Sequence, residues 1–386
     1  MRIVRLANYV APASGGLRTA LRELGAGYLA AGHEPVLVIP GPRPGREYTR
    51  QGLAITVPGV IVPGTGGYRA IATRRPLRRL LDDLAPDRLE VSDRTTLRWT
   101  GRWAQDRGVR SMMVSHDSLA KLTGMFAPPG LTGQWVSDQL NASTAACYDV
   151  VVCTTGWAAA EFRRLHVRNL RQVPLGVDLD CFRPSNRDAG LRAQFAEPGQ
   201  PLLVHCSRLS PEKRPERAIG ALAELRRRGV PAVLVVAGDG PRLRGLRAQA
   251  RDLPVRFLRY VTDRAVLARL LATADVVIAP GPAETFGLSA LEGLASGTPV
   301  VVNDTSALPE VIGQAGLPAA DNDAAFADAI QDLLDSDVAV RRARARARAE
   351  RFGWPAAVAG FLDAHGLSPA TPRLSPAAPF QAGGAR

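Results

Sequence analysis

The chain has 386 residues, of which 46% are hydrophobic and 22% charged, and this usage excludes a disordered or fibrous protein. Two domains of ordinary size are expected at this length. The formal net charge of +13 suggests an anionic partner, but the sequence contains no helix-turn-helix, zinc-finger or RNP pattern and only 5% aromatic residues. Nucleic acid is therefore not the expected partner, whereas a phosphorylated substrate or anionic lipid remains compatible with the charge.

Strand-like runs alternate with amphipathic helical stretches along the first half of the chain. This alternation is typical of a parallel sheet with helices on both faces. A helix is expected over residues 16–33, and strands are expected at 2–10, 34–41, 53–59, 87–93, 109–117 and 148–155. The N-terminus lacks the apolar region of a signal peptide and no run is long enough to span a bilayer. We therefore expect a cytoplasmic protein, with peripheral contact at the inner face of the membrane left open.

The second half repeats the same pattern, with strands expected at 201–210, 231–240, 254–261, 274–281 and 298–303. The segment 171–190 between the halves is rich in Pro, Gly and Asp, which is the composition of a hinge. Residues 368–386 are rich in Pro and Ala without apolar periodicity, so we expect a disordered tail. The fold predicted is α/β, with two doubly wound Rossmann-like domains facing each other across a cleft.

Two carboxylates mark the region 275–301. A strand leads into Pro-Gly-Pro and Glu284, and a helix expected to begin near Phe286 carries Glu292. The amides and dipole at that helix N-terminus favour phosphate. At a rise of about 1.5 Å per residue, Glu292 is expected roughly 10 Å from Glu284. Such spacing suits a ligand with hydroxyl groups at both ends and a diphosphate between them, which is the shape of a nucleotide-diphosphate sugar.

Cations and glycines suited to the diphosphate occur at other strand ends. Arg208 and Lys213 follow the strand at 201–210, and their side chains can reach the same cleft. Gly15 and Gly16 open the helix after the first strand, where the missing side chain lets the backbone approach a phosphate closely.

Five stretches, in this order, resemble the retaining GT-B glycosyltransferases of family 4, and among them actinobacterial mannosyltransferases: SGGLRTAL, SHDSL, PLGVDLDCFRP, SRLSPEKRP and AETFGLSALEGLASGTPVV. The resemblance implies an acceptor-binding N-terminal domain over 1–173, completed by a C-terminal helix at about 354–367. It implies a nucleotide-sugar-binding domain over 174–353.

The resemblance also implies roles for particular residues. Glu284 would hold hydroxyl groups of the donor sugar and Glu292 those of the ribose. The sugar and the phosphates would meet the backbone of Phe286, Gly287 and Leu288.

In the same way, Arg208 and Lys213 would neutralise the departing diphosphate, and Gly15 and Gly16 would close on the phosphates from the other domain. His116 would contact the donor sugar near the reacting carbon. Attack from the front face, with the leaving phosphate accepting the proton of the acceptor, would explain retention without a nucleophile. No cofactor and no metal is expected, and Asp178 and Asp180 are interpreted as part of a turn.

The acceptor side is less marked in the sequence. Asp93 and Arg94 end a strand that faces the cleft and are candidates for acceptor contacts. Arginines on one face of the segment 72–81 are interpreted as a solvated surface in preference to a lipid contact. The stretch 64–69 is interpreted as a flexible loop. Arg259 stands where relatives often carry glycine beside the base pocket, which leaves the nucleobase undecided.

The reaction expected is transfer of a hexose, with mannose from GDP-mannose preferred, to a glycolipid or small glycoside. A UDP-N-acetylglucosamine-dependent transferase that acts on a natural product or another small molecule is the alternative. A phosphorylase requires a Schiff-base lysine, and the only lysines are Lys121 and Lys213. A sugar-nucleotide epimerase would act on its donor without an acceptor, and a non-catalytic sensor would leave the donor intact.

Overall fold

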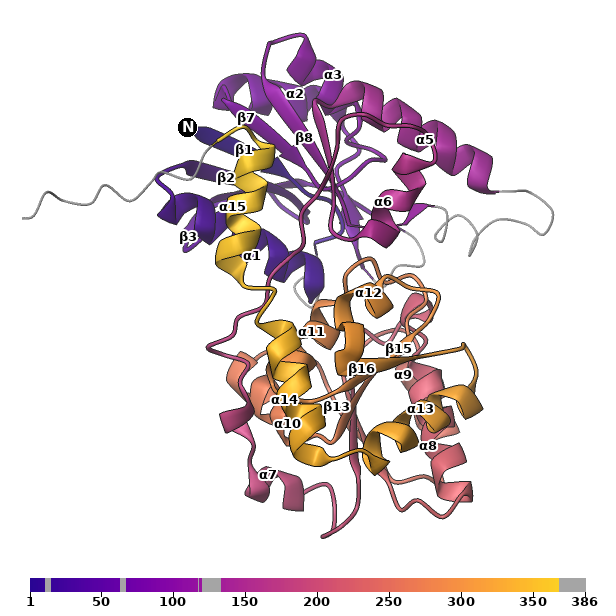
Figure 1. The fold of residues 1–386 in the computed structure, drawn as a ribbon. Helices are drawn as coiled ribbons and strands as arrows, with labels where there is room; N and C mark the ends of the chain where they lie inside the picture. Colours follow the sequence, from indigo (N-terminus) through magenta and orange to yellow (C-terminus); the bar gives the residue numbers. More distant parts are fainter. Residues whose placement is uncertain (11–14, 63–66, 117, 120–132, 368–386) are drawn as a thin grey trace, which may run out of the picture.

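In the computed structural model of the chain, residues 1–10, 15–62, 67–116, 118–119 and 133–367 are described. They form two parallel-sheet units, one above the other in Figure 1. The predicted tail over 368–386 and residues 64–66 of the predicted loop lie outside these residues.

The described part of the N-terminal half forms an eight-stranded sheet in the order β10-β9-β8-β7-β1-β2-β4-β3. All its pairings are parallel except that of β3 with β4. The strands are β1 (Arg2–Leu6), β2 (Glu34–Gly41), β3 (Gly45–Thr49), β4 (Gly52–Pro58), β7 (Arg88–Val91), β8 (Arg110–Ser115), β9 (Val150–Cys153) and β10 (Leu170–Gln172). A separate small ribbon pairs β5 (Val60–Ile61) with β6 (Arg69–Ala70).

Helices cover both faces of this sheet because its central strands are apolar on both sides. Ile3 and Val4, adjacent in β1, are both fully buried and belong to different clusters. Apolar side chains of α1 (Gly16–Ala30) pack with Ile3, and those of α2 (Arg74–Leu84), α3 (Trp99–Gln105) and α6 (Gly156–Arg163) pack with Val4. The helix α5 (Gly133–Cys147) contacts α3 and α6.

The described part of the C-terminal half forms a six-stranded, wholly parallel sheet in the order β13-β12-β11-β14-β15-β16. Its strands are β11 (Leu202–Cys206), β12 (Val233–Ala237), β13 (Val255–Leu258), β14 (Val276–Ala279), β15 (Val300–Asn303) and β16 (Gly316–Ala319). This is the doubly wound order, in which the topology reverses between the first and fourth strands, here β11 and β14. Ligands bind such sheets at the carboxyl ends of the strands beside this reversal.

The helices of the second unit are α8 (Pro215–Arg227), α9 (Leu243–Gln249), α10 (Arg264–Thr273), α11 (Leu288–Ala295), α12 (Leu308–Ile312), α13 (Asp323–Asp335) and α14 (Val338–Ala349). The short helix α7 (Ala189–Ala193) and the 3₁₀ turns η1 (Pro184–Asn186), η2 (Pro211–Lys213) and η3 (Gly313–Ala315) occupy connections. The helices α8, α9 and α13 pack on one face of the sheet, and α10, α11 and α14 pack on the other.

The chain passes between the units twice, and the two crossings are hydrogen-bonded to each other. The Val177 N–H donates to the Phe352 carbonyl at 2.8 Å. A side chain on Gly176 would collide with the Trp354 backbone at 2.6 Å, so this glycine permits the close approach. The predicted hinge segment is thus one of two adjoining crossings.

The last helix, α15 (Trp354–Ala364), returns to the first unit and packs on α1. Just beyond it, His365 Nε2 lies 3.2 Å from the buried carboxylate of Glu90. Arg5 donates to the same carboxylate at 2.8 Å and Tyr28 donates at 2.8 Å. Although burial acts to raise the pKa of Glu90, Arg5 and the hydrogen bond from His365 hold it at about 2.

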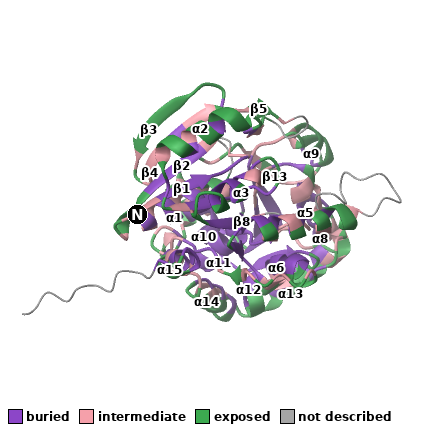
Figure 2. Cartoon of the chain, turned by 90° about the horizontal axis from the view of Figure 1, so that it is seen from above, coloured by how far each residue is buried: buried purple, intermediate pink, exposed green. Residues whose placement is uncertain are grey.

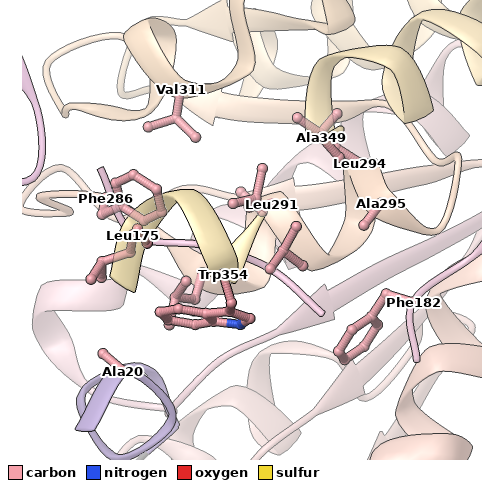
Figure 3. Close-up of a cluster of buried hydrophobic side chains, with 14 of the residues drawn as sticks. Ala20, Leu175, Phe182, Phe286, Leu291, Leu294, Ala295, Val311, Ala349 and Trp354 are labelled. Carbon is pink, nitrogen blue, oxygen red and sulfur yellow. The ribbon is translucent and has the colours of Figure 1, made fainter. Parts of the chain in front are cut away.

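One hydrophobic cluster is continuous between the two units. Figure 3 shows the Trp354 ring between Ala20 of α1 and Leu291 of α11, with Leu175 and Phe286 nearby. The domain limits at 173 and 353 stay a prediction, since the core itself does not end at either residue.

Candidate active site

The predicted site residues follow strands that end at the gap between the two units. His116 comes directly after β8, Arg208 comes two residues after β11, and Glu284 lies in the loop between β14 and α11. The starts of two helices also face each other here, because a side chain on Gly16 would lie 4.0 Å from Leu288 Cδ1. Gly15 is the exposed N-cap of α1.

Glu284 and Lys213 form an ion pair at the entrance of the second unit. Lys213 Nζ donates to Glu284 Oε1 at 2.6 Å, and both side chains are partly buried. Lys213 ends the turn η2, which follows β11, and Glu284 lies in the loop that follows β14. Because β11 and β14 are neighbours in the sheet, their carboxyl ends bring the two side chains together. His205, Ser207, Gly281 and Ser289 line the same small pocket.

The helix after Glu284 begins two residues later than predicted. Gly287 has φ +75° and precedes α11, and a side chain there would lie 2.1 Å from Leu308 Cδ2. Phe286 is in the core, with its ring edge-on to Phe352 at 6.0 Å. Only half of the steps from Glu284 to Glu292 are therefore helical, so the predicted 10 Å separation rested on a helix that is too long.

Glu292 is only 9% exposed, and burial raises its pKa to about 7. Arg264 opposes this shift, with Nη1 3.6 Å from Glu292 Oε1, and its Nη2 lies 3.8 Å from Asp178 Oδ2. Three charged groups shift the pKa of Glu292: Arg264 of α10, Arg22 of α1 and Asp178 of the crossing. Burial raises the pKa of the Cys181 and Cys206 thiols, and the charge of Glu292 in turn raises it further.

Arg264 lies beside the predicted site residue Glu292 and was not among the predicted residues. Its guanidinium lies over the Phe182 ring at 5.0 Å, which fixes it between the hinge segment and Glu292. The sequence does indicate its position, because Arg264 follows the strand β13 and therefore lies at the carboxyl edge of the sheet.

Arg208 is stacked on an aromatic ring of the opposite unit. Its guanidinium carbon lies 4.2 Å from the centre of the Tyr68 ring, and Tyr9 meets Tyr68 edge-on at 6.5 Å. The sequence analysis interpreted Tyr68 as part of a flexible loop. No pattern in the sequence points to this contact, since the two residues are far apart in the chain.

His116 is held on its ring and on its backbone. Its Nε2 lies 3.2 Å from Ser92 Oγ, and its carbonyl accepts a hydrogen bond from Thr285 Oγ1 at 2.5 Å. Burial lowers the pKa of His116 to about 4, so the ring is neutral near pH 7. His205 also has both ring nitrogens engaged, with Ile278 O and Ser207 Oγ at 2.9 Å each, and these contacts give it a structural role.

Asp93 and Arg94 are buried inside the first unit. Asp93 accepts hydrogen bonds from Asn8 and from the Leu97 N–H, and so closes the loop after β7. Arg94 Nη1 donates to Asn141 at 3.0 Å, and its Nη2 lies 3.9 Å from Glu161. These contacts give both residues a structural task, and their acceptor roles stay predictions.

Two further residues singled out in the sequence have surface or turn contacts. Arg259 is 82% exposed and lies 3.4 Å from Asp239, so its side chain does not fill a base pocket. Asp178 accepts from the Cys181 N–H at 2.9 Å, as in the turn expected there. Within the described ranges, no group of three or more His, Cys, Asp or Glu residues could hold a metal ion.

Two doubly wound sheets facing across a cleft define the class of GT-B glycosyltransferases. Solved structures of this class agree with the fold. Sucrose-phosphate synthase from Thermosynechococcus elongatus superposes with a TM-score of 0.74 at 22% identity, covering 92% of this chain and 96% of that one. Anabaena HepE in complex with UDP and glucose gives 0.73 at 18% identity, covering 94% and 98%.

Sequence comparison identifies the family. Residues 15–177 match the glycosyl transferase 4-like domain, and residues 200–336 match glycosyl transferases group 1. The GDP-mannose-dependent alpha-(1-6)-phosphatidylinositol dimannoside mannosyltransferase of Mycobacterium tuberculosis is 50% identical over 364 residues, 94% of this chain and 95% of that protein. A D-inositol 3-phosphate glycosyltransferase of Nocardia farcinica is 32% identical over 50% of this chain and 46% of its own. The chain belongs to the GT-B glycosyltransferases of family 4 and is a glycosyltransferase, as predicted.

Proposed function

We propose that this enzyme transfers mannose from GDP-mannose, with retention, to a glycolipid of the phosphatidylinositol mannoside type. The observation that carries the proposal is the 50% identity to the mycobacterial mannosyltransferase over nearly the full length of both chains. The alternative, a UDP-N-acetylglucosamine-dependent enzyme with a small acceptor, is the outcome against which the donor is tested.

In this proposal the protein supplies position and charge. Glu284 holds hydroxyl groups of the mannose, and its ion pair with Lys213 fixes the carboxylate in place. Lys213, Arg208 and the amides at the start of α11 stabilise the diphosphate as its negative charge develops. Neutral His116, which belongs to the opposite unit, contacts the sugar near the reacting carbon. The leaving phosphate accepts the proton of the acceptor hydroxyl, and no metal takes part.

The donor is tested by incubating the full chain with GDP-mannose, UDP-glucose or UDP-N-acetylglucosamine, and with phosphatidylinositol dimannoside or inositol phosphate as acceptor. We expect an α-linked mannosyl glycolipid from GDP-mannose, with a rate unchanged by EDTA. Transfer from UDP-N-acetylglucosamine to the soluble acceptor would contradict the proposal. A rate lost in EDTA and restored by Mg²⁺ or Mn²⁺ would contradict its metal-free step.

A glycolipid acceptor must reach the enzyme from a bilayer, and we propose that α2 and β5 contact that surface. No described helix is long and apolar enough to cross a membrane. Leu77 and Leu81 of α2 are buried, so the helix presents its exposed arginines outward: Arg74, Arg75, Arg78 and Arg79. The adjoining ribbon exposes Val60 at 53% and Ile61 at 58%, and both elements are exposed in Figure 2. Basic and apolar groups together suit an anionic lipid surface.

Removing two of these arginines is expected to weaken vesicle binding. In the double variant Arg75→Gln, Arg79→Gln the partition onto phosphatidylinositol-containing vesicles should fall at least about tenfold, because each arginine near an anionic surface contributes about 1 kcal/mol. Co-sedimentation measures the effect. The control Arg244→Gln, Arg251→Gln removes equal charge from exposed positions of the second unit and should bind normally. Equal binding of the wild type to neutral phosphatidylcholine vesicles would refute the contact.

A further inference from the structure

The loop that carries Glu284 is hydrogen-bonded to the opposite unit through the next residue, Thr285. The Thr285 hydroxyl donates to the carbonyl of His116 at 2.5 Å. The Thr285 carbonyl accepts from Thr155 Oγ1 at 2.9 Å and from Thr154 Oγ1 at 3.3 Å. Thr285 is 8% exposed, and Thr154 and Thr155 are 1% and 2% exposed. The two hydrogen bonds to the Thr285 carbonyl are therefore shielded from water, and the one from its hydroxyl is partly buried. An unpaired polar group is costly in such surroundings.

Each partner in this contact is fixed within its own unit. Thr155 is the N-cap of α6 and accepts from the Ala158 N–H at 3.1 Å. His116 directly follows β8, and its ring contacts Ser92. On the other side, the Glu284 carbonyl accepts from the Ala307 N–H at 2.9 Å. The hydrogen bonds of Thr285 therefore join segments that are each hydrogen-bonded within their own unit.

The two residues nearest this contact are the ones assigned to the donor sugar. Glu284 precedes Thr285 in the chain, and His116 supplies the carbonyl that Thr285 binds. A change in the angle between the units would alter the distance between these two side chains. A misplacement of about 1 Å at a reacting centre can slow a reaction by about 100-fold.

We propose that Thr285 is a positioning residue, which sets Glu284 and His116 at the correct separation when the two units close on the donor. Thr285 acts on both residues through the main chain. The hydroxyl is the required group, because only it can donate to the His116 carbonyl. The helix start does not need it, since the N-cap of α11 is Gly287. The assay of this proposal rests on the proposed function for its choice of donor.

The test compares Thr285→Val, which keeps the shape and loses the donor, with Thr285→Ser, which keeps the donor. We expect the valine variant to lower kcat about tenfold with KM for GDP-mannose changed by less than about threefold, the result for an interaction made in the transition state. The serine variant should stay within about threefold of the wild-type kcat. Hydrogen exchange of the amides around His116 and Thr155 should become faster in the valine variant alone.

The matched control is Thr298→Val. Thr298 is also fully buried and donates to a backbone carbonyl, that of Leu271 at 2.7 Å, but this bond lies wholly within the second unit. We expect a lower Tm in this variant with kcat and the exchange near His116 unchanged.

Several results would overturn the positioning role. These are a wild-type kcat in Thr285→Val, equal losses in the serine and valine variants, or an equal loss of kcat in Thr298→Val. If the valine variant is too unstable for kinetics, unchanged exchange at His116 in the folded fraction also overturns it. If the wild-type enzyme does not use GDP-mannose as a donor, only the proposed function is contradicted. The same ratios of variant to wild-type kcat are then expected with the donor that the enzyme does use.

Discussion

Replacing Glu284 by glutamine should lower the rate of glycosyl transfer by about 100- to 1000-fold, the loss typical when one charged group that stabilises a transition state is removed. The carboxylate is the acceptor of the Lys213 hydrogen bond at 2.6 Å. Glutamine keeps the size but removes the charge, so it weakens the hold on the sugar hydroxyls. It also leaves the Lys213 ammonium, partly buried, without its counter-charge.

Steady-state kinetics with GDP-mannose and the glycolipid acceptor measure this loss, and circular dichroism confirms the fold. The control Glu197→Gln changes an exposed carboxylate of the second unit and should leave the rate unchanged. A double-mutant cycle with Lys213→Met separates the pair from the individual residues, because residues in direct contact are not additive. We expect the double variant to lose less than the sum of the single losses. Wild-type turnover in Glu284→Gln would remove Glu284 from the site.

Glu292 should make the stability and the donor affinity depend on pH in opposite directions. Its pKa is raised by burial from the ordinary 4.5 to about 7. Between these two values the folded protein keeps a proton that the unfolded chain has lost. The free energy of unfolding therefore falls as the pH rises through this window, by about 3 kcal/mol at most. Above pH 7 the ionised carboxylate predominates, and this is the form that accepts hydrogen bonds from ribose hydroxyls.

The variant Glu292→Gln tests both directions. In urea unfolding it should be more stable than the wild type at pH 8, by up to about 3 kcal/mol, and the difference should shrink at pH 5. Its KM for the donor should be at least about tenfold higher at pH 8, the loss expected for a hydrogen bond to a charged group. That KM should no longer improve between pH 6 and pH 8. A wild-type donor affinity that is constant over this range would show that Glu292 does not hold the ribose in its ionised form.

The sequence was sufficient to place two cations and one carboxylate at the same edge of the second sheet. Arg208, Lys213 and Glu284 all follow strands of one parallel sheet, and such strands end at a common edge, so their place at that edge follows from topology. The Lys213–Glu284 ion pair itself was not predicted, because it depends on the path of two irregular turns. The start of α11 was placed two residues early, since the left-handed Gly287 ends the loop and this conformation does not show in the apolar pattern.

Some features of the structure cannot be predicted from the local sequence. The edge strand β3, with the sequence GREYT, is almost wholly exposed, so it lacks the alternation that marks a half-buried strand. Tyr68 and Arg208 lie 140 positions apart in the sequence and belong to different units, and no local rule links them. Arg264 could have been recognised by its place after β13, whereas its contacts with Asp178 and Glu292 could not.

By itself the sequence determined the fold class, the repetition of two doubly wound units and the place of the predicted site residues after particular strands. These follow from short-range regularities: the period of apolar residues, the position of glycines and the residues after each strand. Only the tertiary structure decided which groups meet across the gap, such as Thr285 with His116 and Arg208 with Tyr68. It also decided that Glu292 is buried and that Asp93 is hydrogen-bonded within the first unit. Burial and pairing depend on the packing of segments that are far apart in the chain.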